Sequence, residues 1–316
     1  MKDLGFKFLI FVLVGLAPHF VNAQACLKFY SRSNIKSVPM KIVNDLFAGS
    51  IDGYYGETKA VLVNASLVSR RNISEINSLF NQTPNGYYGP TKASLVYTSI
   101  VSGKPISELN AMFNKTTDGY YGETKAALVH AAAVSGKPIS EIIDLFNQTP
   151  NGYYGPTKAS LVYTSIVSGK PISELNAMFN KTTDGYYGET KAALVHAAAV
   201  SGKPISEIID LFNQTPNGYY GETKALLVYS VVASGKPISE IIDLFNQTPN
   251  GYYGETKALL VYASIASGKP VSQINALFNQ TPNGYYGPTK ALLVLSSLGL
   301  KIPFEHLLIV LNLKKK

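Results

Sequence analysis

The chain has 316 residues, of which 46% are hydrophobic, so it can bury a large core. Its formal net charge is +8, but the lysines are spread along the chain, and the clustered arginines and aromatic residues that grip phosphates are missing. This diffuse basic charge favours contact with anionic polymers or surfaces and excludes a nucleic-acid patch, while the single cysteine excludes an internal disulfide bond.

Residues 1–23 are predicted to be a secretory signal peptide. Lys2 and Lys7 precede a short apolar run from Phe8 to Leu16, and the segment ends in small residues at Ala23. The run is too short for a membrane span, and Lys, Gly and Pro interrupt every later apolar stretch. We expect cleavage near Ala23 and a mature chain that is secreted, periplasmic or held at the cell surface. Residues 24–38 are a lead segment, in which Cys26 is either a free thiol or, as the less favoured alternative, a lipid anchor.

A repeat of 33 residues dominates the rest of the chain. Each unit carries a Gly-Tyr-Tyr-Gly turn, and residues 39–302 are predicted to hold eight helix-turn-helix repeats. The block from Gly86 to Asn151 recurs letter for letter from Gly152 to Asn217, which indicates duplication. The glycines that open the turns are Gly53, Gly86, Gly119, Gly152, Gly185, Gly218, Gly251 and Gly284.

Two helices are predicted in each unit. The helix after the turn begins where the chain has only Glu or Pro, and both suit a first helical turn. It ends at a glycine such as Gly136, and Pro138 then opens the second helix. There Ile139, Ile142 and Phe146 recur at helical spacing and make one apolar face. The helix after the turn is apolar nearly all round, so we expect it to lie between neighbours in an all-α fold, an α-solenoid of stacked repeats.

The two ends of the array are expected to act as caps. The stretch "PMKIVNDLF" from Pro39 matches the second helix of a unit, so the array starts in the order helix, turn, helix. Residues 303–316 keep the position of such a helix but change its letters, and they are predicted to form a C-terminal capping helix. Its three final lysines suit a helix C-terminus.

The turn and the helix after it resemble the peptidoglycan-binding-like domain of bacterial wall proteins. That family has a short helix, an Asp-Gly-x-Phe/Tyr-Gly turn, and a second helix that starts near a Thr. The resemblance implies all-helical units that bind peptidoglycan, although no hydrolase or transpeptidase region is attached here. The matching residues in one unit are Asp118, Gly119, Tyr121, Gly122, Thr124, Ala127 and Leu128.

The repeat also shows two weaker likenesses, to the EF-hand and to the ankyrin repeat. The stretch from Asn147 mimics an EF-hand loop, but its twelfth position is Lys158, where calcium requires a bidentate Glu, so a calcium site is not expected. The ankyrin repeat has the same length, and "HAAAVSG" from His130 is similar to part of it, but the Thr-to-Gly spacing here is three residues longer.

The tyrosines of the turns are the candidate ligand-binding residues. We expect the second tyrosine of each turn, such as Tyr88, to be a buried pin, and the first to face solvent, where stacked phenols could contact sugar rings. The alternative is that both tyrosines only pack between adjacent units. The first tyrosines are Tyr54, Tyr87, Tyr120, Tyr153, Tyr186, Tyr219, Tyr252 and Tyr285.

Catalysis, metal binding and cofactors are not expected. His130 and His196 occupy a repeat position that elsewhere holds Leu295, which favours packing over chemistry. No set of acid, base and nucleophile emerges from the repeats. The recurring Asn-x-Thr sites, of which Asn81 is the first, are interpreted as helix ends, with glycosylation as the alternative.

These observations predict a secreted, non-enzymatic repeat protein that binds peptidoglycan or another cell-surface glycan through many weak, equivalent sites. The alternative is a structural or adhesive surface protein that has no glycan site and can self-associate. Neither nucleic acid nor a transmembrane segment is expected.

Overall fold

The computed structural model describes residues 37–116, 121–149, 153–182 and 187–300. These residues form sixteen α-helices and no strand, which confirms the all-α class and the tandem helix pairs. The predicted signal peptide, all but the last two residues of the lead segment, and the predicted capping helix at 303–316 lie outside the described residues.

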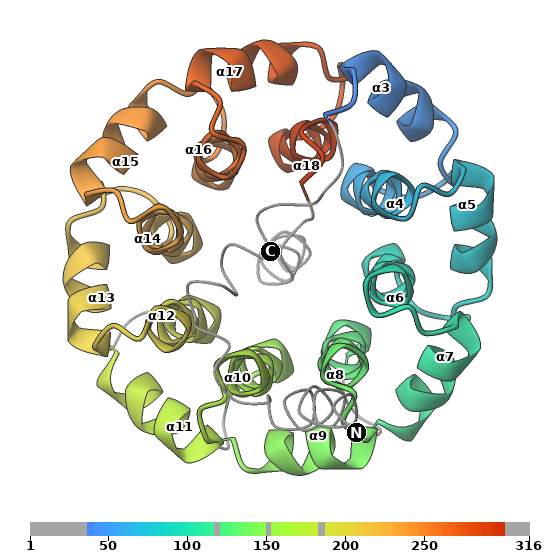
Figure 1. Ribbon diagram of the computed structural model, residues 1–316, viewed down its shortest axis with the longest axis horizontal. Coiled ribbons are helices and arrows are strands. Elements are labelled where there is room, and N and C mark those ends of the chain that lie inside the picture. Colours follow the sequence, from blue (N-terminus) through green and yellow to red (C-terminus); the bar gives the residue numbers. More distant parts are fainter. Residues whose placement is uncertain (1–36, 117–120, 150–152, 183–186, 301–316) are drawn as a thin grey trace, which may run out of the picture.

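The helices are arranged as two concentric rings (Figure 1). The inner helices are seen end-on in that view, and the outer helices run around the circumference. The inner ring consists of α4 (Gly56–Ser69), α6 (Gly89–Ser102), α8 (Gly122–Ser135), α10 (Gly155–Ser168), α12 (Gly188–Ser201), α14 (Gly221–Ser234), α16 (Gly254–Ser267) and α18 (Gly287–Ser297). The outer ring consists of α3 (Met40–Ala48), α5 (Ile73–Asn81), α7 (Ile106–Lys115), α9 (Ile139–Asn147), α11 (Ile172–Lys181), α13 (Ile205–Asn213), α15 (Ile238–Asn246) and α17 (Val271–Asn279).

Local sequence signals set the limits of these helices. Inner helices begin at the second glycine of the turn, so the variable Glu or Pro occupies the second helical position. Most of them end at a left-handed glycine such as Gly136, whose φ is +70°. In the first unit Arg70 takes that place with φ of +59°, and Asn72 replaces the usual proline and caps α5 by accepting a hydrogen bond from the Glu75 amide.

The core lies between the two rings. Each outer helix contributes one apolar face, represented in α9 by Ile139, Ile142 and Phe146, which are all buried. The inner helices are buried on nearly every side, because each packs against two neighbouring inner helices and the outer helices behind it. The sandwiched position predicted for them is therefore confirmed.

The described part of the solenoid closes on itself. The first outer helix, α3, packs on the last inner helix, α18, and α18 packs against α4 as neighbouring inner helices do elsewhere. The Val38 amide donates to the Ser297 carbonyl at 2.7 Å, and the Ser297 hydroxyl donates to the Val38 carbonyl at the same distance. Helices from opposite ends of the array thus form the eighth pair.

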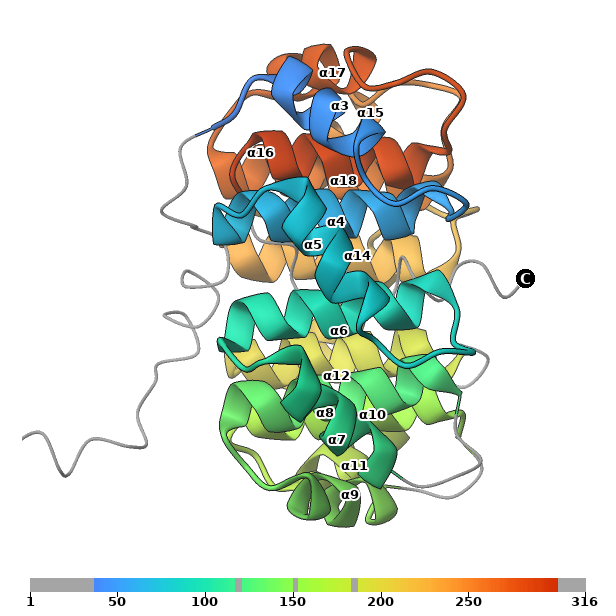
Figure 2. The same cartoon turned by 90° about the vertical axis from the view of Figure 1, so that its right-hand side faces the viewer.

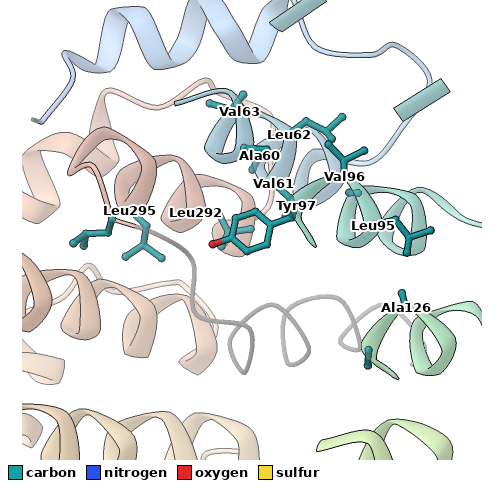
Figure 3. Packing of buried hydrophobic residues seen from close by; sticks show 14 of the residues in the cluster. Ala60, Val61, Leu62, Val63, Leu95, Val96, Tyr97, Ala126, Leu292 and Leu295 are labelled. Carbon is teal, nitrogen blue, oxygen red and sulfur yellow. The ribbon is translucent and has the colours of Figure 1, made fainter. Parts of the chain in front are cut away.

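Apolar packing continues across this joint. Figure 3 places Leu292 and Leu295 of α18 beside Ala60 and Val61 of α4, and all four side chains are fully or almost fully buried in one cluster. Within the described part of the chain, no helix combines the length and the apolar character that crossing a membrane requires.

Candidate binding face

The Gly-Tyr-Tyr-Gly turns, as far as the structure describes them, gather on one face of the ring. Each turn joins the end of an outer helix to the start of an inner helix, and the inner helices all run in the same direction. Figure 2 therefore shows these loops on the right-hand side, and the links from inner to outer helices on the other. The second tyrosine is the N-cap residue of the inner helix, and in Tyr88 it has extended dihedral angles of φ −66° and ψ 155°.

The two glycines of a turn serve different purposes. The first, Gly86, has φ of +82°, a conformation that favours glycine, and an added Cβ would meet nothing within 4 Å. The second, Gly89, opens the helix, and a Cβ there would lie 2.8 Å from Oγ1 of Thr58 and 2.6 Å from Cδ1 of Tyr54. The second glycine thus lets the start of one inner helix approach the preceding unit closely.

The first tyrosines pack between units, and the expectation that they face solvent as a row holds only in part: Tyr219, Tyr252 and Tyr285 are 36–39% exposed, and the other described ones are less exposed. The Tyr54 ring meets Phe80 of the next outer helix edge-on, with ring centroids 4.9 Å apart. At the closing joint, Tyr285 meets Phe47 at 4.8 Å. The equivalent rings of Tyr87, Tyr153, Tyr219 and Tyr252 make the same contact at 4.6–5.1 Å. Tyr120 and Tyr186 lie outside the described residues.

The second tyrosines, predicted to be buried pins, are the more exposed tyrosines of each turn. Their exposed fractions run from 65% in Tyr187 to 80% in Tyr88. The reason is positional, since the N-cap residue stands before the helix on an extended backbone, while the first tyrosine fills the space beside the next Phe and glycine. We name this set the tyrosine face: Tyr55, Tyr88, Tyr121, Tyr154, Tyr187, Tyr220, Tyr253 and Tyr286.

A lysine lies one helical turn after each of these tyrosines. Lys158 is 8% exposed, and its ammonium nitrogen is 4.5 Å from the centroid of the Phe146 ring. The same contact recurs at all eight turns, at 4.5–5.1 Å. Burial lowers the pKa of Lys92, Lys158, Lys224 and Lys257 below the ordinary lysine value. The eight turn lysines are Lys59, Lys92, Lys125, Lys158, Lys191, Lys224, Lys257 and Lys290.

His130 and His196 are buried between inner helices, as a packing role requires. The Nδ1 atom of His130 is 2.9 Å from the Thr98 hydroxyl of the preceding inner helix, and His196 is 3.0 Å from Thr164 in the same way. Tyr163 lies between the two imidazoles, with ring centroids 5.6 Å and 6.2 Å away. These side chains form a buried arc that joins neighbouring inner helices.

The Asn-x-Thr sites end the outer helices, as predicted. Asn81 is the last residue of α5 and is exposed, while the Thr83 hydroxyl is buried and donates to the Phe80 carbonyl at 2.6 Å. Among the described residues, no three His, Cys, Asp or Glu side chains come together in a way that could hold a metal ion.

Sequence reasoning missed the turn lysines as a structural group. Their regular spacing along the chain indicates only an evenly spread positive charge. The signal that could have found them is the distance of twelve residues from Phe146 to Lys158, which recurs in every unit from Phe47 and Lys59 onward.

Comparisons with known protein families, with curated proteins and with solved structures find no match for this chain. The resemblance to peptidoglycan-binding-like repeats therefore stays a prediction.

Proposed function

We propose that this protein is a non-enzymatic, multivalent binder of a cell-surface glycan, and that the tyrosine face is its binding surface. One observation carries the proposal: exposed phenols, 65–80% accessible, stand at equivalent positions on one face of a ring. An aromatic ring offers an apolar surface to a sugar ring, and its hydroxyl offers a hydrogen bond. The binding role therefore passes from the first tyrosines, which pack between units, to the second ones.

Ring geometry favours avidity. A polymeric glycan presents many copies of one sugar, and the turns present many copies of one side chain on a rigid scaffold. Binding at one turn raises the effective concentration of ligand at the next, so weak single contacts sum to a strong attachment. Peptidoglycan is the first ligand to test because of the resemblance in the turn, and a location outside the cell follows from the predicted signal peptide.

The alternative, a protein that only spaces or assembles at a surface, receives less support. An open solenoid can extend head to tail through its two free ends. Here α3 and α18, the first and last described helices of the array, cover one another. The first tyrosines already supply an aromatic contact between units, while the second tyrosines are 65–80% exposed.

The test is co-sedimentation with insoluble peptidoglycan and with other insoluble wall glycans. The wild-type protein is expected to sediment with at least one of them. A variant with all eight second tyrosines changed to Ser should keep the helical circular dichroism spectrum and stay in the supernatant. A matched control changes the exposed helix residues Glu141, Glu207 and Glu240 to Gln and should sediment like the wild type. The proposal is wrong if the wild type sediments with no glycan, or if the Ser variant sediments equally well.

A further inference from the structure

The turn lysines are the least explained charged groups of the ring. Each is only 6–8% exposed, and no hydrogen bond or ion pair joins its ammonium to another residue in the described part of the chain. None of the eight nitrogens belongs to the fully enclosed polar atoms that lack a partner, so each keeps some contact with solvent. These are nearly buried cations that still touch solvent.

Burying a cation in this way is unfavourable unless something compensates it. The Phe ring beneath each ammonium compensates in part, since the ring face attracts cations. It offers no hydrogen-bond acceptor of the kind that an ammonium group, with three donors, ordinarily finds. At all eight turns the chain itself, as far as the structure describes it, supplies no acceptor to the ammonium, so this place is open to solvent or to an anionic ligand.

Other lysines of the same repeat show the contrast. Lys104, Lys137 and Lys203 follow the glycines on the opposite face of the ring, and each pairs with a glutamate four residues later in its outer helix. Their side chains are also much more exposed than the turn lysines. The repeat thus pairs the lysines of one face and leaves those beneath the tyrosine face without a carboxylate.

The inner helices add positive potential at the same face. Their N-termini all lie there, so the positive ends of these dipoles face the turns, and the inner helices are longer than the outer helices whose C-terminal ends lead into the same turns. Lys158 is four residues after Tyr154, its N-cap residue, and the Lys158 amide donates to the Tyr154 carbonyl at 3.2 Å. The lysine ammonium, the N-terminus of the inner helix and the exposed tyrosine therefore lie within one helical turn of each other along the chain.

We propose that each turn binds an anionic group, with the lysine ammonium as its cationic partner and the second tyrosine beside it. The ligand is an acidic polysaccharide, whose carboxylate or sulfate groups recur along the chain. This inference rests on the proposed function and narrows it from glycans in general to acidic ones. The formal net charge of +8 favours approach of such a polymer over long distances.

The turns are not all equal in this respect. In five of them the second helical residue is a glutamate, and in three it is Pro90, Pro156 or Pro288. A carboxylate two residues before the lysine repels an incoming anion. The strongest anionic sites are therefore at Lys92, Lys158 and Lys290.

The experiment measures binding of soluble polygalacturonate, dextran sulfate and neutral dextran by titration calorimetry at low and high salt. The wild type is expected to bind one or both charged polymers, and the one it binds identifies carboxylate or sulfate as the recognised group. The variant K92M/K158M/K290M removes three charges but keeps apolar bulk over the Phe rings, and its affinity should drop about tenfold or more. The control K137M/K203M/K236M removes three paired lysines from the opposite face and should change affinity less than about threefold.

Each result decides the matter. Equal affinity in the two triple variants, or binding of neutral dextran as tight as that of both charged polymers, overturns the acidic-ligand inference but leaves glycan binding by the tyrosines intact. Loss of all glycan binding in the wild type overturns both. Thermal unfolding checks that each variant folds. If the triple variant does not fold, the two single substitutions K158M and K158R are compared instead, and K158R should keep the affinity that K158M loses.

Discussion

Ring closure can be tested at Phe47, which lies on the first helix of the array. In an open solenoid this side chain would sit on a terminal helix with a neighbour on one side only. In the ring, Phe47 is 2% exposed, with Tyr285 at 4.8 Å and the Lys59 ammonium at 5.1 Å. Phe80, in the middle of the array, has matching surroundings: Tyr54 at 4.9 Å and Lys92 at 4.8 Å. The substitutions F47A and F80A therefore form a matched pair.

The structure predicts that both substitutions are equally costly. Deleting a fully buried Phe side chain removes its transfer free energy and leaves a cavity, which together destabilise a protein by about 3–5 kcal/mol. Each variant also loses an edge-to-face aromatic contact worth about 1 kcal/mol and a cation–π contact of similar size, both contained in that total. Urea unfolding followed by circular dichroism gives the free energy of unfolding for wild type, F47A and F80A.

Amide hydrogen exchange supplies a second, local measurement. Terminal helices of repeat arrays fray, so their amides exchange at far lower opening free energies than those inside. Closure predicts protection of α3 comparable to that of α5. A cost below about 1 kcal/mol for F47A beside one above 3 kcal/mol for F80A, with rapid exchange throughout α3, would refute the closed ring.

Two further perturbations probe the turn. In G188A the new Cβ would lie 2.6 Å from Oγ1 and 3.0 Å from Cγ2 of Thr157, so overpacking should destabilise the protein by about 1–3 kcal/mol. The second substitution T157A removes these atoms and should restore most of the lost stability. Strictly additive free energies of unfolding in this double-mutant cycle would contradict the contact. Burial lowers the pKa of Lys158 in the folded protein, so the unfolded chain holds that proton more tightly, and the free energy of unfolding should rise with pH between the lowered pKa and the ordinary value of 10.5. K158M cannot titrate there, so the wild type should gain stability relative to K158M across that window, and parallel pH curves for the two proteins would show that the lysine is not desolvated.

Helix limits could be predicted from sequence because they depend on local chemistry. A left-handed glycine such as Gly136 stops a helix wherever it stands, and Pro138 can open the next one without regard to the rest of the fold. The amphipathic spacing of Ile139, Ile142 and Phe146 likewise fixes which face is buried. These properties belong to single residues or single helices, so the sequence of one unit is enough to predict where its helices end and which faces are buried.

Ring closure could not be predicted in this way. It depends on the rotation between successive units: a full turn of 360° divided among eight pairs is about 45° each, and a different rotation would leave an open spiral. That angle results from contacts between units, such as the approach of Gly89 to Thr58. A sequence reader sees the glycine but not the neighbour that makes it necessary.

The two tyrosines of a turn show the same limit. They are adjacent and chemically identical, and only the next unit distinguishes them. Phe80 and Gly89 offer a surface that Tyr54 contacts, whereas Tyr55, as the N-cap, is 69% exposed. A motif read within one unit assigned the buried role to the wrong ring, because the partner of the buried ring is 26 residues further along the chain.

Closure also connects the duplication in the sequence to the number of binding positions. The duplicated block contains two units, and its inner helices differ, since one supplies a Thr and the next a His. Thr98 pairs with His130 inside the first copy, and Thr164 with His196 inside the second, so copying two units together preserves each buried hydrogen bond. Adding or removing such a block from an open array would simply change its length. In a closed ring it would change the angle that every junction must adopt, so the contacts between units hold the number of turns, and with it the number of exposed tyrosines and turn lysines, at eight.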